Sequence, residues 1–197
     1  MIITNKEKDL IEKTVSVLKK GGVIVYPTDT LYGLGVDIEN DEAVKKLENI
    51  KGRPGPWSIA VSNIKMLSSY AKIPTYHLKF INNKLPGSNT IILESKSNTI
   101  SNYLLGPNNS IGIRIPDHSI PQKITKLLGR GITSTSVNRT KSKPLNDPNL
   151  IIKEFFNNVD LILDFGKLPN SKASNIYNLI DEKIIKIRWK YLFFYFF

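Results

Sequence analysis

The spacing of apolar residues changes repeatedly along the 197-residue chain, and this alternation is the strongest constraint on its fold. Ile11, Val15 and Leu18 follow the helical repeat, and a glycine pair at 21–22 ends that pattern. The run VIVY at 23–26 is typical of a buried strand instead. Further helices are predicted at 41–50, 63–70, 74–84, 119–129 and 151–158, and further strands at 58–62, 89–93, 110–115, 131–137, 159–163, 174–180 and 183–188. Helices interleaved with strands predict an α/β fold with a mixed β-sheet.

Capping residues predict where two of the helices begin. Thr4 and Glu7 have the spacing of a capping box ahead of the first helix. Asp41 is placed to cap the second helix. The segment PTDTLYGLG at 27–35, between the first strand and the second helix, is predicted to be a loop because Pro and Gly punctuate it.

Length and composition predict one domain without disulfides. The chain is long enough for one well-filled core, which we assign to residues 1–190, and residues 191–197 form a short apolar tail, YLFFYFF. With no Cys and only two His, disulfides and thiolate metal sites are excluded, and we expect no metal site made of side chains. The first ten residues lack the apolar core of a secretory signal, and no run reaches the about 20 apolar residues that span a bilayer. We therefore expect a cytoplasmic protein without a membrane segment.

The formal net charge of +11 suggests an anionic partner, either nucleic acid or a phosphorylated small molecule. Lysines are spread along the whole chain, including its ordinary-looking helices. This spread favours solvated lysines over a patch built for one ligand, so charge alone does not choose the partner.

A pair of cations opens the stretch IKGRPGPWSIAV at 50–61. Lys51 and Arg53 precede a predicted strand, and the prolines that follow fix φ and limit how far the pair can move. Arg supplies a planar fork of donors and Lys a mobile point charge, so the pair suits a triphosphate. A basic pair at a solvated edge of the sheet is the more common case, and this motif alone does not establish a site.

Polar residues occupy two other predicted strands. Ser134 and Ser136 alternate in TSTSVN and so share one face of a strand, and Asn138 continues that face. These side chains suit phosphate oxygens or a ribose, and they equally suit a half-exposed sheet edge. Arg114 lies among isoleucines in SIGIRIP, so it either pairs with an acid or meets an anionic ligand.

Together these motifs make the chain resemble the YrdC-like family of threonylcarbamoyl-AMP synthases, from about residue 8 to residue 188. YPTDTLYGLG matches the family's opening loop, KGRP its Lys-x-Arg signature, SIGIRIPDH its Arg-containing strand, and STSVN its Ser-x-Asn signature. After Asn138 the chain reads RTKSKP, where the family often has a Ser-Gly turn. The chain resembles the short, single-domain branch. The resemblance implies a curved mixed β-sheet flanked by helices, with a deep basic cleft.

The resemblance also implies a reaction. Family members join ATP, L-threonine and bicarbonate into threonylcarbamoyl-AMP and pyrophosphate, with Mg²⁺ carried on the ATP, for threonylcarbamoyladenosine modification of tRNA by separate transfer proteins. Carried over by position, Lys51 and Arg53 are the catalytic residues. The ATP-binding residues implied by the resemblance are Lys51, Arg53, Ser110, Ser136, Asn138 and Arg188. The threonine-binding residues implied in the same way are Thr28, Ser62, Arg114, Ser134 and Ser174.

Two other functions stay open at this point. The first is an RNA-binding module, since +11 could hold phosphates and Tyr and Phe could stack on bases; we expect such binding to be weak and steeply salt dependent. The second is a paralogue that keeps the fold and the ATP site but uses another acceptor. For Thr28 a purely structural role in a turn, and for Ser174 a surface hydroxyl, also remain open.

Overall fold

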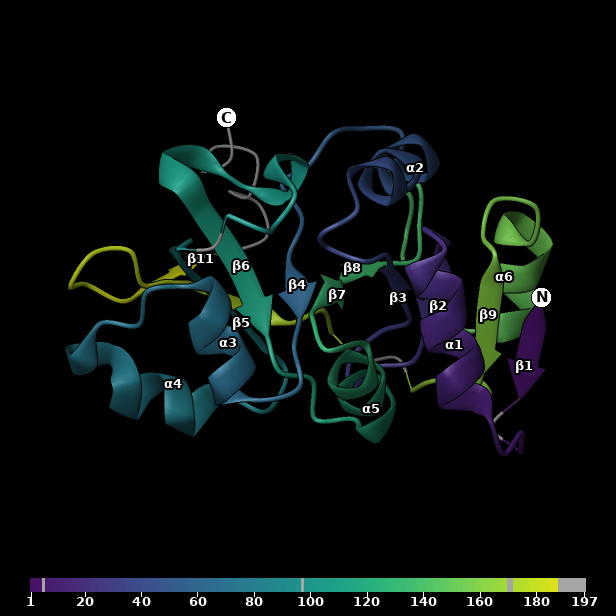
Figure 1. The fold of residues 1–197 in the computed structure, drawn as a ribbon, viewed down its shortest axis with the longest axis horizontal. Helices are drawn as coiled ribbons and strands as arrows, with labels where there is room; N and C mark the ends of the chain where they lie inside the picture. The colour runs from purple at the N-terminus through teal and green to yellow at the C-terminus, as the bar shows by residue number, and fades with distance from the viewer. Residues whose placement is uncertain (5, 97, 170–171, 188–197) are drawn as a thin grey trace.

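The computed structural model describes residues 1–187 apart from 5, 97 and 170–171, and it contains two mixed sheets with helices around them (Figure 1). The five-stranded sheet has the order β1 (Ile2–Thr4), β9 (Leu161–Asp164), β2 (Ile24–Tyr26), β3 (Gly33–Gly35) and β8 (Thr135–Ser136). The six-stranded sheet has the order β11 (Ile185–Ile187), β10 (Asn175–Asn178), β5 (Asn89–Glu94), β6 (Ser110–Arg114), β4 (Ile59–Ala60) and β7 (Ile132–Thr133). The predicted α/β class with mixed strand directions is confirmed.

Both sheets combine parallel and antiparallel neighbours. In the five-stranded sheet β9 is parallel to β1 and to β2, whereas β3 is antiparallel to β2 and β8. In the six-stranded sheet β10 is parallel to β5 and β4 to β6, and the other pairs are antiparallel. The strands therefore form two sheets, and the single curved sheet implied by the resemblance is divided.

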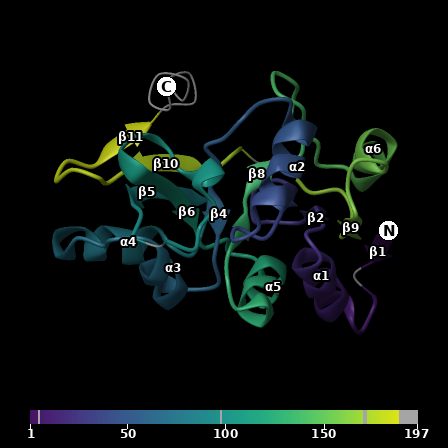
Figure 2. The same cartoon turned by 45° about the horizontal axis from the view of Figure 1, so that its top comes forward.

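Six α-helices surround the sheets in the described part of the chain. They are α1 (Leu10–Lys19), α2 (Asp41–Lys51), α3 (Ile64–Tyr70), α4 (Leu78–Lys84), α5 (Ser119–Leu128) and α6 (Pro148–Phe155). Short 3₁₀ turns lie at Thr75–His77, Asn102–Leu104 and Pro107–Asn109. In Figures 1 and 2, α3 and α4 lie beside the six-stranded sheet, while α6 lies beside β9 at the other end of the molecule.

The caps of the first two helices differ from the prediction. Thr4 lies in β1, and α1 begins only at Leu10, so the predicted capping box does not form. Asp41, the predicted cap, is instead the first residue of α2, and the cap is Asn40, whose side chain accepts a hydrogen bond from the backbone N–H of Ala43 at 3.0 Å. Asn accepts such a bond as well as Asp does, so the sequence allowed the cap to be Asn40, one residue before the predicted Asp41.

Two strands are absent from the sequence prediction. β1 is only three residues long and pairs with β9, about 160 positions away, so no local pattern marks it. β3 lies inside the predicted loop and contains two of the glycines that suggested a turn. A Cβ on Gly35 would lie 2.8 Å from Cε1 of Tyr26, so this glycine is needed for the aromatic ring to pack across the strand pair.

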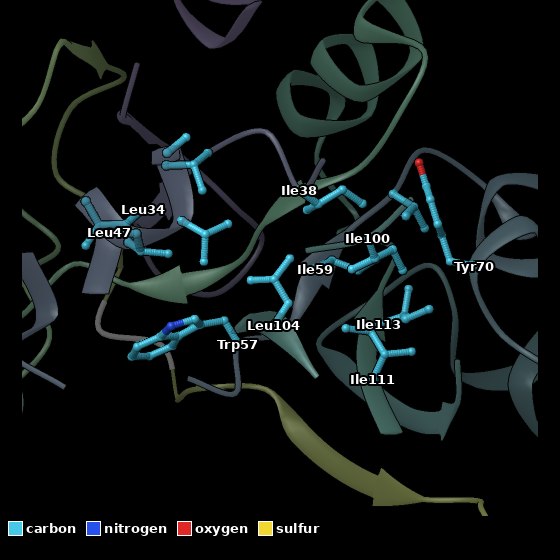
Figure 3. Close-up of a cluster of buried hydrophobic side chains, with 14 of the residues drawn as sticks. Leu34, Ile38, Leu47, Trp57, Ile59, Tyr70, Ile100, Leu104, Ile111 and Ile113 are labelled. Carbon is cyan, nitrogen blue, oxygen red and sulfur yellow. The ribbon is translucent and has the colours of Figure 1, made fainter. Parts of the chain in front are cut away.

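The larger of two clusters of buried side chains that extend into both sheets lies between α2 and the strands. It contains Leu34 from β3, Ile59 from β4, Ile113 from β6 and Leu47 from α2, all with 0% exposure (Figure 3). Because residues of both sheets share this cluster, the sheets are fixed against each other by apolar burial.

The chain passes from one sheet to the other at Ser134. The predicted strand 131–137 is in fact two short strands, β7 in the six-stranded sheet and β8 in the five-stranded sheet. Between them the N–H of Ser134 donates to the carbonyl of Ser58 at 2.7 Å. Ser134 therefore lies at the junction of the sheets, between β7 and β8, whereas Ser136 is in β8, so the two serines are not on one continuous strand as predicted.

Left-handed glycines end two of the helices, and their replacement should cost stability. Gly52 (φ 72°) follows α2 and Gly129 (φ 79°) follows α5, and an added Cβ at either position would meet no atom within 4 Å. Only the backbone conformation opposes a side chain there. We expect Gly52→Ala and Gly129→Ala each to lower the free energy of unfolding by about 1 kcal/mol.

Urea denaturation would measure both losses. The exposed Lys126→Ala variant, inside α5, is the control and should change the free energy of unfolding by less than about 0.5 kcal/mol. Unchanged stability in both glycine variants would contradict the assigned helix ends.

Candidate functional site

A cavity of about 360 Å³ lies where the two sheets meet, within the usual range for a small-molecule site. Its lining comes from the loop before β3, the end of α2, the segment leading into β4, strands β5, β6 and β8, the loop after β8 and the segment leading into β10. The polar and charged residues that line it are Thr28, Thr30, Tyr32, Lys51, Arg53, Trp57, Ser58, Thr90, Ser110, Arg114, Ser134, Thr135, Ser136, Asn138, Thr140, Lys141, Ser142 and Ser174.

Most of the residues selected from the sequence meet in this cavity. Those that line it are Thr28, Lys51, Arg53, Ser110, Arg114, Ser134, Ser136, Asn138 and Ser174. Ser62 is not in the lining: its hydroxyl lies 3.7 Å from Sδ of Met66 and accepts from Nδ2 of Asn63, at the start of α3. Ser62 is thus not among the residues that the cavity brings together, and its contact with threonine stays a prediction. Arg188 falls outside the described residues, as does the apolar tail 191–197.

Lys51 is the last residue of α2, and its side chain extends into the cavity rather than into solvent. Its residue exposure is 3%, and its ammonium donates to the carbonyl of Ser136 and to Oδ1 of Asn138, both at 2.8 Å. Burial, together with the nearby charge of Arg53, lowers the pKa of Lys51 from 10.5 to about 7. No carboxylate in the described part of the chain forms an ion pair with this lysine, so it is a cation held ready for an anion.

Arg53 is held by the turn that follows α2 and by an aromatic ring. The guanidinium carbon lies 4.0 Å from the centre of the Trp57 ring, and Nη1 donates to the carbonyl of Pro54 at 2.7 Å. The turn itself is fixed because Glu48 accepts from the backbone N–H of Gly55 at 2.8 Å. Burial lowers the pKa of Arg53 from its ordinary value, as expected for a cation partly removed from water.

Asn138 connects the lysine to the loop that follows β8. Its Oδ1 accepts from Lys51 and also from the hydroxyl of Ser136 at 2.7 Å. Its Nδ2 donates to the carbonyls of Arg139 at 3.0 Å and Ser142 at 2.7 Å. All four bonds are internal, so the side chain of Asn138 positions Lys51 and the loop.

Arg114 enters the cavity from β6 and is paired with an acid. Its Nη2 donates to Oδ1 of Asp29, and its Nη1 donates to the hydroxyl of Thr30 at 3.2 Å. The two side chains of the ion pair are 7% and 10% exposed, and Ser88 donates to the other oxygen of Asp29. Nε of Arg114 is buried and has no hydrogen-bond partner. The arginine therefore has its acid and still retains a donor that a ligand could satisfy.

The hydroxyl groups in the lining differ in how many hydrogen bonds they already make to other protein groups. Oγ1 of Thr28 accepts from the N–H groups of Thr30 and Leu31 and donates to the carbonyl of Leu31, which is the arrangement of a turn. The structural role considered for Thr28 is thus present, although the residue also lines the cavity. Ser174 shares a hydrogen bond of 2.9 Å with Thr90, another lining residue, so it is not an isolated surface hydroxyl.

Two residues that hold the arginines of the site, Trp57 and Asp29, had not been selected from the sequence. Trp57 is the platform under Arg53 and is also within 5.7 Å of the ammonium of Lys51, and its buried indole nitrogen has no hydrogen-bond partner. An aromatic residue four positions after Arg53 was a usable signal. Asp29, the partner of Arg114, lies within the YPTDT motif, but nothing local in the sequence links it to a strand 85 positions later.

The charges around the cavity are of one sign. Lys51, Arg53, Arg114 and Lys141 line it, and no Asp or Glu is among its described lining residues. The described residues also contain no group of three His, Cys, Asp or Glu side chains that could hold a metal ion. An Mg²⁺ ion in the cavity would therefore take its oxygen ligands from a bound phosphate and from water, as this ion commonly does.

Within residues 1–187, apart from the gaps given above, no helix is long and apolar enough to cross a membrane.

Comparison with known proteins gives a consistent family. The Sua5/YciO/YrdC family model, described as "Telomere recombination", matches residues 16–189. A protein of Methanocaldococcus jannaschii named "Putative threonylcarbamoyl-AMP synthase" is 36% identical over 183 residues, which cover 90% of this chain and 86% of that protein. The "Uncharacterized protein YciO" of Escherichia coli K12 is 30% identical over 187 residues, covering 93% of this chain and 90% of YciO.

Solved structures agree with the sequence matches. The crystal structure of E. coli YciO, 30% identical, has a TM-score of 0.85 and covers 95% of this chain and 93% of its own. P. abyssi Sua5 in complex with L-threonine has a TM-score of 0.87 at 24% identity, and the match covers 95% of this chain but 56% of Sua5. The Sua5 match shows the fold, whereas the family model and the two relatives with at least 30% identity show descent. The chain belongs to the Sua5/YciO/YrdC family.

Proposed function

We propose that this protein is a threonylcarbamoyl-AMP synthase, a nucleotidyltransferase that makes threonylcarbamoyl-AMP and pyrophosphate from ATP, L-threonine and bicarbonate. The observation that carries the proposal is the cavity itself, where Lys51 and Arg53 face the row of Ser134, Ser136 and Asn138. Three reagents that repel one another need such an enclosed, cationic space in order to meet.

Membership of the family supports the proposal from a second direction. The archaeal relative with 36% identity carries a synthase name, and the Sua5 structure with the same fold holds L-threonine. E. coli YciO, an equally extensive match, carries no assigned activity. The proposal therefore depends on the cavity residues as well as on the names.

The triphosphate of ATP would bind at the end of the cavity formed by Lys51 and Arg53. At an effective dielectric near 20, a unit charge 4 Å from a phosphate oxygen contributes about 4 kcal/mol before desolvation is subtracted. Lys51 has already lost its water to burial, so its desolvation cost is met in the folded protein. Ser136, whose carbonyl accepts from Lys51, and Ser110, another lining residue, would offer their hydroxyls to the nucleotide, and Asn138 holds the lysine in place.

The threonine would bind at the end formed by Arg114. Its carboxylate would accept from Nε of Arg114, the donor without a partner, while Asp29 continues to hold Nη2. Thr28, Ser134 and Ser174 surround the same region and would contact the amino acid.

The chemistry needs no protein nucleophile. The amine of threonine and bicarbonate give a carbamate and water, and a carbamate oxygen then attacks the α-phosphorus while the bond to pyrophosphate breaks. Both partners are anions, so the enzyme contributes orientation and charge neutralisation. Mg²⁺ bound to the phosphates would neutralise further charge on the leaving pyrophosphate. The product would pass to separate proteins that modify tRNA in the cytoplasm.

The activity is tested by incubating the purified protein with ¹⁴C-bicarbonate, ATP and one amino acid at a time. We expect labelled threonylcarbamoyl-AMP and pyrophosphate with L-threonine, and at least about tenfold less product with serine or valine, because each lacks a group that the polar and apolar lining would contact. Adenylate formation that prefers another amino acid would indicate the paralogue, and no adenylate with any amino acid would reject the proposal.

Loss of either phosphate-facing cation should stop turnover. We expect Lys51→Ala and Arg53→Ala each to lower kcat/KM by at least about a hundredfold, since each removes charge stabilisation that no other residue replaces. Lys45→Ala is the matched control, because Lys45 lies on the exposed face of α2 and pairs with Glu42. Circular dichroism would establish that each variant is folded. Near-normal rates in both variants would remove the pair from the mechanism.

Phosphate binding should be linked to protonation of Lys51. An anion stabilises the charged lysine, so its pKa of about 7 rises on binding and the protein takes up a proton above that pH. Between pH 7 and pH 10 the affinity for pyrophosphate should then fall by up to about tenfold per pH unit. In Lys51→Arg the side chain stays charged throughout this range, so the fall in affinity caused by loss of the lysine proton should be absent. Any fall caused by the titration of pyrophosphate itself should be the same in both proteins.

Calorimetry at pH 8 in buffers with different ionisation enthalpies would count the protons taken up. The wild type should take up more protons per pyrophosphate than Lys51→Arg does. Equal proton uptake by the two proteins would refute the assignment of the titrating group to Lys51.

A further inference from the structure

The loop after β8 brings to the cavity a cation that belongs to none of the four motifs. Thr140, Lys141, Ser142 and Pro144 all line the cavity, on the side where Ser136 and Asn138 lie. Lys141 and Lys143 are both exposed, but Lys143, in the middle of the same loop, does not line the cavity. Proximity in sequence therefore does not explain why Lys141 is part of the lining.

The loop is fastened to the phosphate-facing pair. The backbone N–H and the hydroxyl of Thr140 both donate to the carbonyl of Lys51, at 3.0 and 2.8 Å. Asn138, which holds the ammonium of Lys51, also donates to the carbonyl of Ser142. The residues on both sides of Lys141 are thus tied to the lysine of the Lys-x-Arg pair or to its partner.

The backbone of Lys141 is in a conformation that a side chain disfavours. Its φ is 69°, in the left-handed region where glycine is the usual residue. A lysine held there at the edge of a cavity is an exception to local preference, and such exceptions gather at functional sites.

The ammonium of Lys141 has no protein partner. It forms no ion pair and no hydrogen bond with any described residue, and no acidic residue is part of the described lining. Lys141 therefore adds a third positive charge without an ion pair to those of Lys51 and Arg53. Three cations around one end of a cavity match a polyphosphate better than a monoanion.

We propose that Lys141 binds the terminal phosphates of a nucleoside triphosphate and the pyrophosphate that leaves, and so makes the site favour polyphosphate ligands over nucleoside monophosphates. The inference rests on the proposed function only in that the cavity accepts ATP. It assigns to Lys141 a role in affinity and in selection by phosphate number, and it leaves the identity of the amino acid open.

Isothermal titration calorimetry with pyrophosphate, ATP and AMP tests the role without any turnover. The main variant is Lys141→Gly, which removes the ammonium and relaxes the left-handed backbone, so that no new strain is introduced. We expect it to bind pyrophosphate and ATP about tenfold more weakly than the wild type, the range for loss of one charged hydrogen bond, with AMP unchanged. Lys141→Arg should retain most of the affinity, and Lys143→Ala, the matched control from the same loop, should bind all three ligands as the wild type does.

Several outcomes would overturn the inference. Wild-type affinity in Lys141→Gly would remove the lysine from the site. Weaker binding in Lys141→Ala but not in Lys141→Gly would trace the effect to the backbone, and an equal loss in Lys143→Ala would reduce it to general surface charge. An equal loss for AMP and pyrophosphate would refute the assignment to terminal phosphates. If the wild type binds pyrophosphate in this pattern but forms no threonine adenylate, the proposed function fails and this inference stands.

Discussion

The ammonium of Lys51 joins the end of α2 to β8, and the geometry of the cavity depends on this contact. The lysine donates to the carbonyl of Ser136 and the side chain of Asn138, and its own carbonyl accepts twice from Thr140. A buried ammonium without a carboxylate partner is unfavourable, because neutral oxygens replace only part of its hydration. The folded protein accepts that cost at the point where a phosphate would relieve it, which is the usual exchange of stability for binding at a functional site.

The junction of the two sheets explains why polar residues gather at this place. A continuous strand would have directed Ser134 and Ser136 by simple alternation and buried the backbone groups between them. The chain instead leaves β7, bonds to Ser58 through Ser134, and enters β8 in the other sheet. The cavity lies at this crossing and takes its lining from strands of both sheets, which the cluster in Figure 3 holds together. The site is therefore a consequence of the division of the sheet.

The sequence predicted the class of the fold and most of the cavity, and its failures have a common physical origin. Periodicity located every helix and the longer strands, because those segments bury one face. It missed β1 and β3, which depend on partners far away in the chain, and it could not detect the break at Ser134 because strands of two residues have no period. The sequence motifs identified nine residues that line the cavity. Ser62 is not among them, since its hydroxyl contacts Met66 of α3. The sequence did not predict that Asp29 pairs with Arg114, because a side-chain pair so far apart in the chain is set by packing.

The two ends of the cavity differ in how their cations are compensated, and this difference supports the proposed orientation of the substrates. Arg114 is neutralised by Asp29, so a ligand there gains one donor and little net charge, which suits the single carboxylate of an amino acid. Lys51, Arg53 and Lys141 form no ion pair with a described residue, and only Glu48 acts favourably on Arg53, so a ligand there meets a net positive charge, which suits a triphosphate. If ATP bound with its triphosphate at Arg114, the phosphates would compete with Asp29 for the arginine. The three cations at the other end would then face only the carboxylate of the amino acid. Coulomb energy grows with the product of the charges, so the arrangement that places the more highly charged ligand against the unpaired cations is the favoured one.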